Sequence, residues 1–121
     1  NSNKRKKIFN NLKKSNFNLP SFVSKTSKIS KNTKIGEGSI VHKICHIGRD
    51  VKIGKCNIIN TGFIIEHDCK IGDFCHISTS VTINGSSIIG DESFIGSGSI
   101  LSNDIKLKKK SFIKMMSRVT K

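Results

Sequence analysis

Large aliphatic residues recur at every sixth position of this chain without a break. The series reads Val23, Ile29, Ile35, Val41, Ile47, Ile53, Ile59, Ile65, Ile71, Ile77, Ile83, Ile89, Ile95, Leu101, Leu107, Ile113 and Val119. Four places after each aliphatic residue the chain mostly carries a small residue such as serine or cysteine. An α-helix would need a period near 3.6 and an ordinary strand a period of 2. The pattern therefore predicts a solenoid of short strands and bends, in which each repeat turns one large and one small residue inward.

This pattern resembles the left-handed parallel β-helix of hexapeptide-repeat transferases, which have three hexapeptides in each triangular coil. The resemblance implies an all-β fold in which residues 29–118 form about five coils and positions 18 apart stack. The large side chain of Phe63 occupies one of the small positions. It would then stack between Cys45 and Val81, which are compact enough to leave room for its ring.

The N-terminal segment has a different pattern. Residues 4–15 place Ile8, Phe9 and Leu12 on one side of a short predicted helix, with lysines around the rest. We expect this helix to pack on a neighbouring domain or on an end of the solenoid. Residues 16–21 contain Pro20 and read as a linker. We divide the chain into residues 1–22, the last helix and linker of a preceding domain, and residues 23–121, the solenoid. Because the chain begins with asparagine rather than methionine, we expect it to be a piece of something longer.

Charge and cysteine content narrow the possible partners. The 121 residues carry a formal charge of +14, almost all of it from lysine, with no Trp or Tyr. A nucleic-acid-binding surface would usually combine arginine with aromatic residues, so the sequence argues against that function. We interpret the lysines as scattered over solvent positions, where they suit acidic ligands such as coenzyme A or nucleotide phosphates.

Three of the four cysteines, Cys45, Cys69 and Cys75, occupy the small inward positions. We expect them to be reduced, as in a cytoplasmic protein. No apolar run approaches the length of a membrane span and no signal peptide is present, so no membrane association is predicted.

Candidate chemistry centres on the sequence Glu66-His67-Asp68. His67 is the third residue of its hexapeptide, which places it outward near a bend. An imidazole can accept a proton at neutral pH, and an adjacent carboxylate can fix its tautomer. A solenoid face is flat, however, and a catalytic pocket needs a second wall. We expect a homotrimer, in which residues of two subunits line a shared cleft.

The segment from Asn60 to Ile77 reads NTGFIIEHDCKIGDFCHI. It resembles the active-site region of the sialic acid O-acetyltransferase and UDP-4-amino-sugar N-acetyltransferase (NeuD/PglD-like) family. The Asn84-Gly85, Ile89-Gly90 and Ile95-Gly96 pairs continue that family's pattern. The resemblance covers almost the whole chain and is strongest over residues 58–100.

The resemblance implies acetyl transfer from acetyl-CoA to an amine or hydroxyl of a nucleotide-linked sugar or a sialic acid, without a metal. The matched positions are His67 as general base, Asp68 as the adjacent acid, His76 and Gly96 as acetyl-CoA contacts, and Asn60 near the acceptor. The amine or hydroxyl would attack the thioester directly, so no nucleophilic serine or cysteine is needed.

Other functions remain open from the residues alone. Zinc carbonic anhydrases of this fold use two histidines five residues apart, a spacing absent among His42, His46, His67 and His76. We assign His42 and His46 to the surface. A non-enzymatic solenoid is the alternative from another class, and would be favoured if His67 faced open solvent with no subunit opposite it. An acyltransferase with a non-sugar acceptor, such as serine or an amino-acid intermediate, is the alternative among enzymes.

Overall fold

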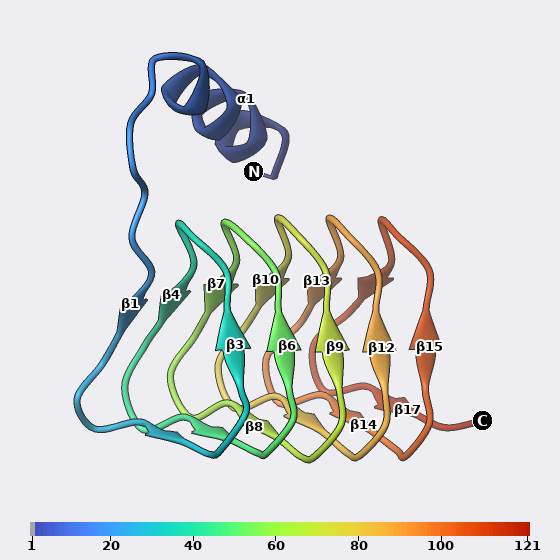
Figure 1. The fold of residues 1–121 in the computed structure, drawn as a ribbon. Coiled ribbons are helices and arrows are strands. Elements are labelled where there is room, and N and C mark those ends of the chain that lie inside the picture. The colour runs from blue at the N-terminus through green and yellow to red at the C-terminus, as the bar shows by residue number, and fades with distance from the viewer. Residues whose placement is uncertain (1) are drawn as a thin grey trace.

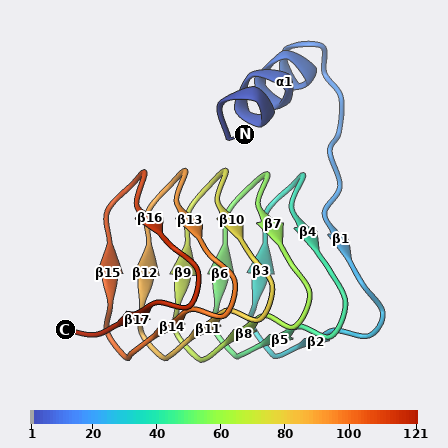
Figure 2. The ribbon, with the colours of Figure 1, turned by 180° about the vertical axis from the view of Figure 1, so that it is seen from behind.

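The computed structural model describes residues 2–121, which form one helix followed by seventeen two-residue strands. Helix α1 spans Ser2–Lys14. The strands build three parallel sheets, which we name A, B and C (Figures 1 and 2). Sheet A contains β1 (Phe22–Val23), β4 (Ile40–Val41), β7 (Ile58–Ile59), β10 (His76–Ile77), β13 (Phe94–Ile95) and β16 (Phe112–Ile113). Sheet B contains β2 (Lys28–Ile29), β5 (His46–Ile47), β8 (Ile64–Ile65), β11 (Thr82–Ile83), β14 (Ile100–Leu101) and β17 (Arg118–Val119). Sheet C contains β3 (Lys34–Ile35), β6 (Lys52–Ile53), β9 (Lys70–Ile71), β12 (Ile88–Ile89) and β15 (Lys106–Leu107).

Each strand from β1 to β14 pairs in parallel with the strand 18 residues further along the chain. In sheet A, for example, Ile58 lies opposite His76, and His76 lies opposite Phe94. Consecutive strands belong to different sheets, so the chain turns a corner after every strand and closes a triangle every three strands. The result is a left-handed parallel β-helix of about five coils, as the hexapeptide pattern predicts. Figure 1 shows the coils stacked side by side along one axis.

The interior contains the two sets of residues that the period predicts. From β4 to β14 the aliphatic residue of every strand is buried, with an exposed fraction of 3% or less. The ring of Phe63 is fully buried, which confirms that the small positions on either side leave room for it. Burying each large aliphatic side chain stabilises the fold by roughly 1.5–3 kcal/mol. The stacked interior is therefore the main source of stability.

The small inward positions also contribute hydrogen bonds. The Ser39 hydroxyl donates to the Gly54 carbonyl at 2.8 Å and accepts from the Asn57 amide at 2.9 Å. The Asn57 side chain repeats this arrangement one coil further along, on the Gly72 carbonyl and the Cys75 amide. These bonds satisfy backbone groups that the corners would otherwise bury unpaired.

The cysteines at the small positions pack as predicted. Cys45, Cys69 and Cys75 are buried, and all four cysteines are free thiols. Burial raises the pKa of the Cys75 thiol to about 11. A thiol in that state is a poor nucleophile, so these cysteines serve as packing groups.

Helix α1 lies along a corner of the solenoid, and the prediction that it covers a coil end is wrong (Figure 1). The Phe9 ring, with 4% of its surface exposed, packs edge-on against the ring of Phe74. Corner residues that contact α1 include Gly38, Phe74 and Glu92, which belong to different turns of the same corner between sheets C and A. Thirteen helical residues span about 20 Å, which is enough to cross several coils about 4.8 Å apart.

Polar contacts attach both ends of α1 to this corner. Arg5 Nη2 donates to the carbonyls of Phe74 and Cys75 at 3.1 and 3.2 Å. Lys6 pairs with Glu92 at 3.6 Å, and Lys13 pairs with Glu37 at 3.1 Å. That residues 1–22 belong to a preceding domain stays a prediction. Over residues 2–121, the structure contains no helix with the length and apolar character needed to cross a membrane.

Candidate active site

His67 and Asp68 form a hydrogen-bonded pair at the corner between sheets B and C. His67 follows β8, and Asp68 takes a left-handed backbone conformation with φ of 60° that turns the chain toward β9. His67 Nδ1 lies 2.8 Å from Asp68 Oδ2. Each side chain is about half exposed, at 47%. The pair is thus formed within a single turn and is open to a ligand from outside the solenoid.

The carboxylate sets the tautomer of the imidazole. An ionised carboxylate can only accept hydrogen bonds, so the Asp68 contact places a proton on His67 Nδ1. Nε2 of the neutral ring is then the acceptor nitrogen and is directed away from Asp68. Arg49 supports the carboxylate, with Nη1 at 2.8 Å from Asp50 and 4.0 Å from Asp68. The corner therefore presents a basic nitrogen held by a charged network.

Gly85 provides the space in which the His67 ring lies. It occupies the corner position one coil beyond His67, and a Cβ added to it would sit 2.7 Å from His67 Nε2 and 2.8 Å from Cε1. No ordinary side chain fits that close to the ring. The sequence analysis did not identify Gly85 as a site residue, although the 18-residue stacking rule places it next to His67.

A shallow groove on the sheet B side adjoins this pair. Its volume is about 420 Å³, and His46, Arg49, Glu66 and His67 are among its lining residues. His46 is exposed at the surface, as predicted, yet its side chain lies in the same groove as His67. The groove gives a ligand access to the imidazole from sheet B.

The remaining predicted site residues lie in sheet A or directly after its strands. Asn60 Nδ2 lies 3.2 Å from His76 Nε2, and the His76 ring packs edge-on against Phe94. Burial lowers the pKa of His76, and the nearby positive charge of Arg5 lowers it further. His76 is therefore held in its neutral form more strongly than a free histidine. A pocket of about 210 Å³ between α1 and sheet A includes Arg5, His76 and Glu92 in its lining.

Gly96 follows β13 in sheet A, at the stacking position two coils beyond Asn60. A Cβ added to Gly96 would come within 2.7 Å of the Met115 Cα in the next coil. Close stacking of the coils thus requires a glycine here. The strand that Gly96 follows, β13, is next to β10, which contains His76, and two strands from β7, which Asn60 follows.

One chain therefore holds two separate groups of predicted site residues. His67 and Asp68 lie at the corner between sheets B and C. His76 lies in sheet A, the opposite side of the triangle, and Asn60 and Gly96 directly follow strands of that sheet. Each side is six residues long, or roughly 20 Å at about 3.3 Å per residue. The corner and the opposite sheet are then on the order of 15 Å apart, with the packed interior between them. No small reacting group can contact both within one chain.

The described residues contain no group of three histidine, cysteine, aspartate or glutamate side chains arranged to hold a metal ion. His42, His46, His67 and His76 occur on different strands and corners of the solenoid.

Comparisons with known proteins agree on the type of fold. A family model described as bacterial transferase hexapeptide (six repeats) matches residues 68–103. The acetyltransferase domain of PglB from Neisseria gonorrhoeae superposes with a TM-score of 0.94 at 25% identity, over 98% of this chain and 58% of that one. The same domain in complex with acetyl coenzyme A gives a TM-score of 0.93 at 25% identity, over 99% of this chain and 60% of that one. No curated protein matches the sequence.

A third solved structure shows the same fold at lower identity. It is a histidine-to-asparagine variant of perosamine N-acetyltransferase from Caulobacter crescentus, in complex with CoA and GDP-perosamine. It superposes with a TM-score of 0.91 at 22% identity, over 98% of this chain and 59% of that one. The chain thus spans about three fifths of the length of these proteins. The resemblance to hexapeptide-repeat acetyltransferases is confirmed.

Proposed function

We propose that this hexapeptide-repeat solenoid transfers an acetyl group from acetyl-CoA to an amine or hydroxyl of a nucleotide-linked sugar. The observation that carries the proposal is the 2.8 Å contact between His67 Nδ1 and Asp68 Oδ2, on an exposed corner of the solenoid. The comparisons support the substrate classes, because the related proteins were solved with acetyl coenzyme A, and with CoA and GDP-perosamine.

In the proposed reaction His67 acts as the general base. Nε2 takes the proton from the acceptor amine or hydroxyl, and the freed electron pair attacks the thioester carbonyl carbon. The carbon–sulfur bond then breaks, the CoA sulfur leaves and takes up a proton, and the acetyl group stays on the acceptor. Asp68 stabilises the imidazolium that forms on His67 and keeps Nε2 directed toward the acceptor.

We propose that a second copy of the chain completes the site, as in a homotrimer. The corner that carries His67 would face sheet A of the next copy, which supplies Asn60, His76 and Gly96. Two observations support this arrangement. The two groups lie on opposite sides of one chain, and sheet A carries an outward column of mostly apolar residues. That column consists of Phe22, Ile40, Ile58, His76, Phe94 and Phe112.

Part of this column is open to solvent in the single chain. Phe22 is 63% exposed and Phe112 is 71% exposed. Covering such side chains removes apolar surface from water, which favours association. In this arrangement His76 and Gly96 belong to the acetyl-CoA side of the cleft, and Asn60 lies near the acceptor. A neutral His76 is able to share a hydrogen bond with the acetyl-CoA thioester or its amides.

A nucleotide-linked amino sugar is favoured by the GDP-perosamine complex of a similar fold. A sialic acid and a non-sugar acceptor such as serine are the alternative acceptors, and both can be tested by thiol release from acetyl-CoA. The free cysteines suit a reaction in the reducing cytoplasm.

The direct test measures thiol release from acetyl-CoA with a panel of acceptors. UDP- and GDP-linked 4-amino sugars, a free sialic acid and serine would each be supplied to the wild type and to His67→Ala. We expect the amino sugars to give the fastest release, and His67→Ala to lower that rate by about 10²–10⁴-fold. His42→Ala is the matched control, because His42 is exposed and lies outside both groups. Equal rates in the wild type and His67→Ala would remove the base assignment, and no release with any acceptor would favour a non-enzymatic solenoid.

Mixing two inactive variants tests the shared site. His67→Ala and His76→Ala each remove one side of the proposed cleft, so a homotrimer of either variant contains no complete site. After the two variants are unfolded together and refolded, about a quarter of the clefts would combine an intact His67 with an intact His76 by random pairing. We expect activity to return in the mixture and not in either variant alone. A mixture as inactive as its components would refute the two-copy site.

A further inference from the structure

Not all lysines of this chain are scattered, because four of them form a column on the outer surface of sheet C. Lys34 lies opposite Lys52, and Lys52 lies opposite Lys70, in consecutive coils. Ile88 follows, and Lys106 lies opposite Ile88. Adjacent strands are about 4.8 Å apart, so the ammonium groups of Lys34, Lys52 and Lys70 share one small region of surface. Like charges placed directly opposite each other on a sheet are destabilising.

The protein itself leaves this column without counter-charges. All four lysines are exposed, and none of them takes part in an ion pair with any residue of the described chain. Most carboxylates are engaged elsewhere. Glu37 and Glu92 pair with α1, and the carboxylates of Asp73 and Asp91 accept backbone amide hydrogen bonds at a corner. The positive charge on sheet C is therefore available to a ligand.

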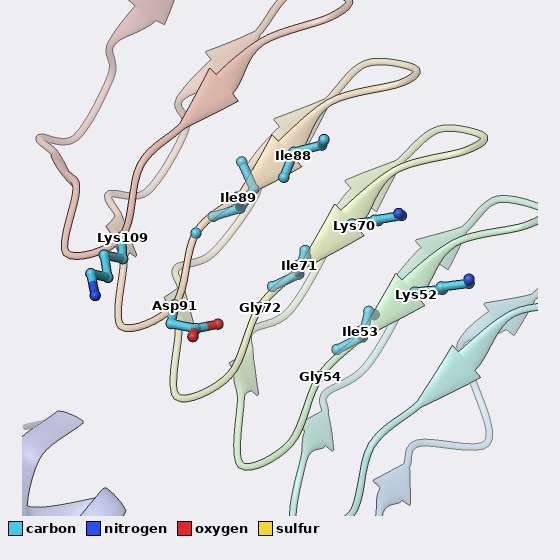
Figure 3. Close-up of a pocket in the computed structure, with 11 residues that line it drawn as sticks. Lys52, Ile53, Gly54, Lys70, Ile71, Gly72, Ile88, Ile89, Asp91 and Lys109 are labelled. Atoms are coloured by element: carbon cyan, nitrogen blue, oxygen red, sulfur yellow. The ribbon is translucent and has the colours of Figure 1, made fainter.

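A groove runs beside the column (Figure 3). It has a volume of about 560 Å³ and is lined by Lys52 and Lys70 on one side and by Asp91 and Lys109 at the corner. Gly54 and Gly72 are among its lining residues, and the coils stack too closely there for a side chain at either position. A Cβ added to Gly54 would collide with the Gly72 carbonyl and with Asp73 Oδ1, and a Cβ on Gly72 would collide with Asp91. In Figure 3 the side chains of Lys52 and Lys70 project in parallel from neighbouring strands.

The column passes beside the candidate base. Lys70 is three residues beyond His67 in the same coil, which places its backbone about 10 Å from that of His67. Lys52 is stacked on Lys70 from the preceding coil. A ligand whose reacting group meets His67 can therefore place a neighbouring anionic group on these two lysines.

We infer that sheet C is a phosphate-binding subsite, in which Lys52 and Lys70 hold the phosphate groups of a nucleotide substrate bound at the His67 corner. The inference rests on the proposed function and specifies how that site holds its substrate. Lysine ammonium groups bind phosphate oxygens as point charges, which suits an exposed surface. The phosphates have two possible sources, the diphosphate of a nucleotide-linked acceptor and the phosphates of CoA.

A single-stranded nucleic acid fits this surface less well. Such ligands are held by aromatic rings that stack on the bases. The residues that line the sheet C groove include no aromatic side chain and no arginine. The number of adjacent free lysines also suits a compact ligand with two or three phosphates.

Binding measurements without turnover test the inference. Titration calorimetry of the full chain would use UDP, GDP, CoA and 3′-dephospho-CoA as probes, for the wild type and for the double variant Lys52→Gln/Lys70→Gln. The matched control is Lys25→Gln/Lys43→Gln, which removes the same charge from exposed positions away from sheet C. We expect the sheet C variant to weaken binding by about tenfold and the control to change it by less than twofold. Raising the salt concentration should weaken wild-type binding and have a smaller effect on the sheet C variant.

The four probes separate the two sources of phosphate. A loss confined to UDP or GDP assigns the subsite to the acceptor. A loss confined to CoA assigns it to the donor, and a smaller loss with 3′-dephospho-CoA locates the 3′-phosphate there. Equal weakening in the sheet C variant and the control, or no weakening with any probe, overturns the inference.

The binding test of the sheet C subsite does not depend on whether His67 is the general base. His67→Ala tests the proposed chemistry through the rate of thiol release, whereas the lysine variants are read through binding alone. A chain that binds nucleotides through Lys52 and Lys70 but releases no thiol would retain the subsite and contradict the proposed function. A chain that turns over normally with both lysines removed would retain the function and contradict the subsite.

Discussion

Replacing Gly85 by alanine is expected to displace the His67 imidazole while the solenoid stays folded. The new Cβ would lie 2.7 Å from His67 Nε2, whereas ordinary contact begins at 3.4 Å, so the ring must move by about 0.7 Å. The backbone of Gly85 does not adopt a positive φ, so alanine adds no backbone strain there. The His67 side chain is about half exposed and has room to swing outward.

The displacement acts on catalysis more than on stability. Moving the ring loosens its 2.8 Å contact with Asp68 and places the new methyl group beside the basic nitrogen. Misplacement of a reacting group by about 1 Å costs on the order of 10²-fold in rate, so we expect Gly85→Ala to lower kcat by roughly 10–100-fold. The free energy of unfolding should change by less than about 1 kcal/mol, because a flexible exposed side chain absorbs the strain.

The assay is thiol release from acetyl-CoA, measured alongside thermal unfolding. Ser86→Ala is the matched control, since Ser86 is the exposed neighbour of Gly85 in the chain. In a His67→Ala background, Gly85→Ala should cause no further loss of rate, because the two changes act on the same group. The reasoning is refuted if Gly85→Ala retains the wild-type rate, or if it lowers the rate equally with and without the imidazole.

Three further predictions concern the fold. Phe63→Ala should lower the free energy of unfolding by about 3–5 kcal/mol in urea titration, because a fully buried ring leaves a cavity; a loss below about 1 kcal/mol would contradict the packing described. Phe9→Ala should speed hydrogen exchange in α1 while Ile8→Ala does not, because Phe9 is buried against the corner and Ile8 is 56% exposed; equal effects would contradict the docking of the helix. His76→Gln should flatten the loss of thermal stability on acidification. The folded-state pKa of His76 is lowered, so the unfolded chain binds a proton that the folded chain does not as pH falls through about 6.5. The wild type therefore loses stability as the pH falls below about 6.5. Identical Tm profiles for the wild type and His76→Gln between about pH 7.5 and 5 would contradict this contribution of His76.

Only part of the candidate site could be predicted from the sequence. The pair His67 and Asp68 are neighbours in the chain, so a local pattern was enough to single them out, and the structure places them in contact. The placement of α1 was wrong, because three apolar residues show that a helix must pack but not on which surface. Gly85 was missed because its importance depends on a side chain 18 residues away.

The sequence by itself determined which residues point into the solenoid, since the inward or outward direction repeats with the chain and is a local property of strands and bends. The tertiary structure alone decided which outward residues lie side by side. Closing a coil every three strands stacks Lys52 on Lys70 and Gly85 next to His67, and it sets His76 on the side opposite His67. These relations depend on the angle through which each corner turns, which the backbone conformation sets and the hydrophobic period does not record.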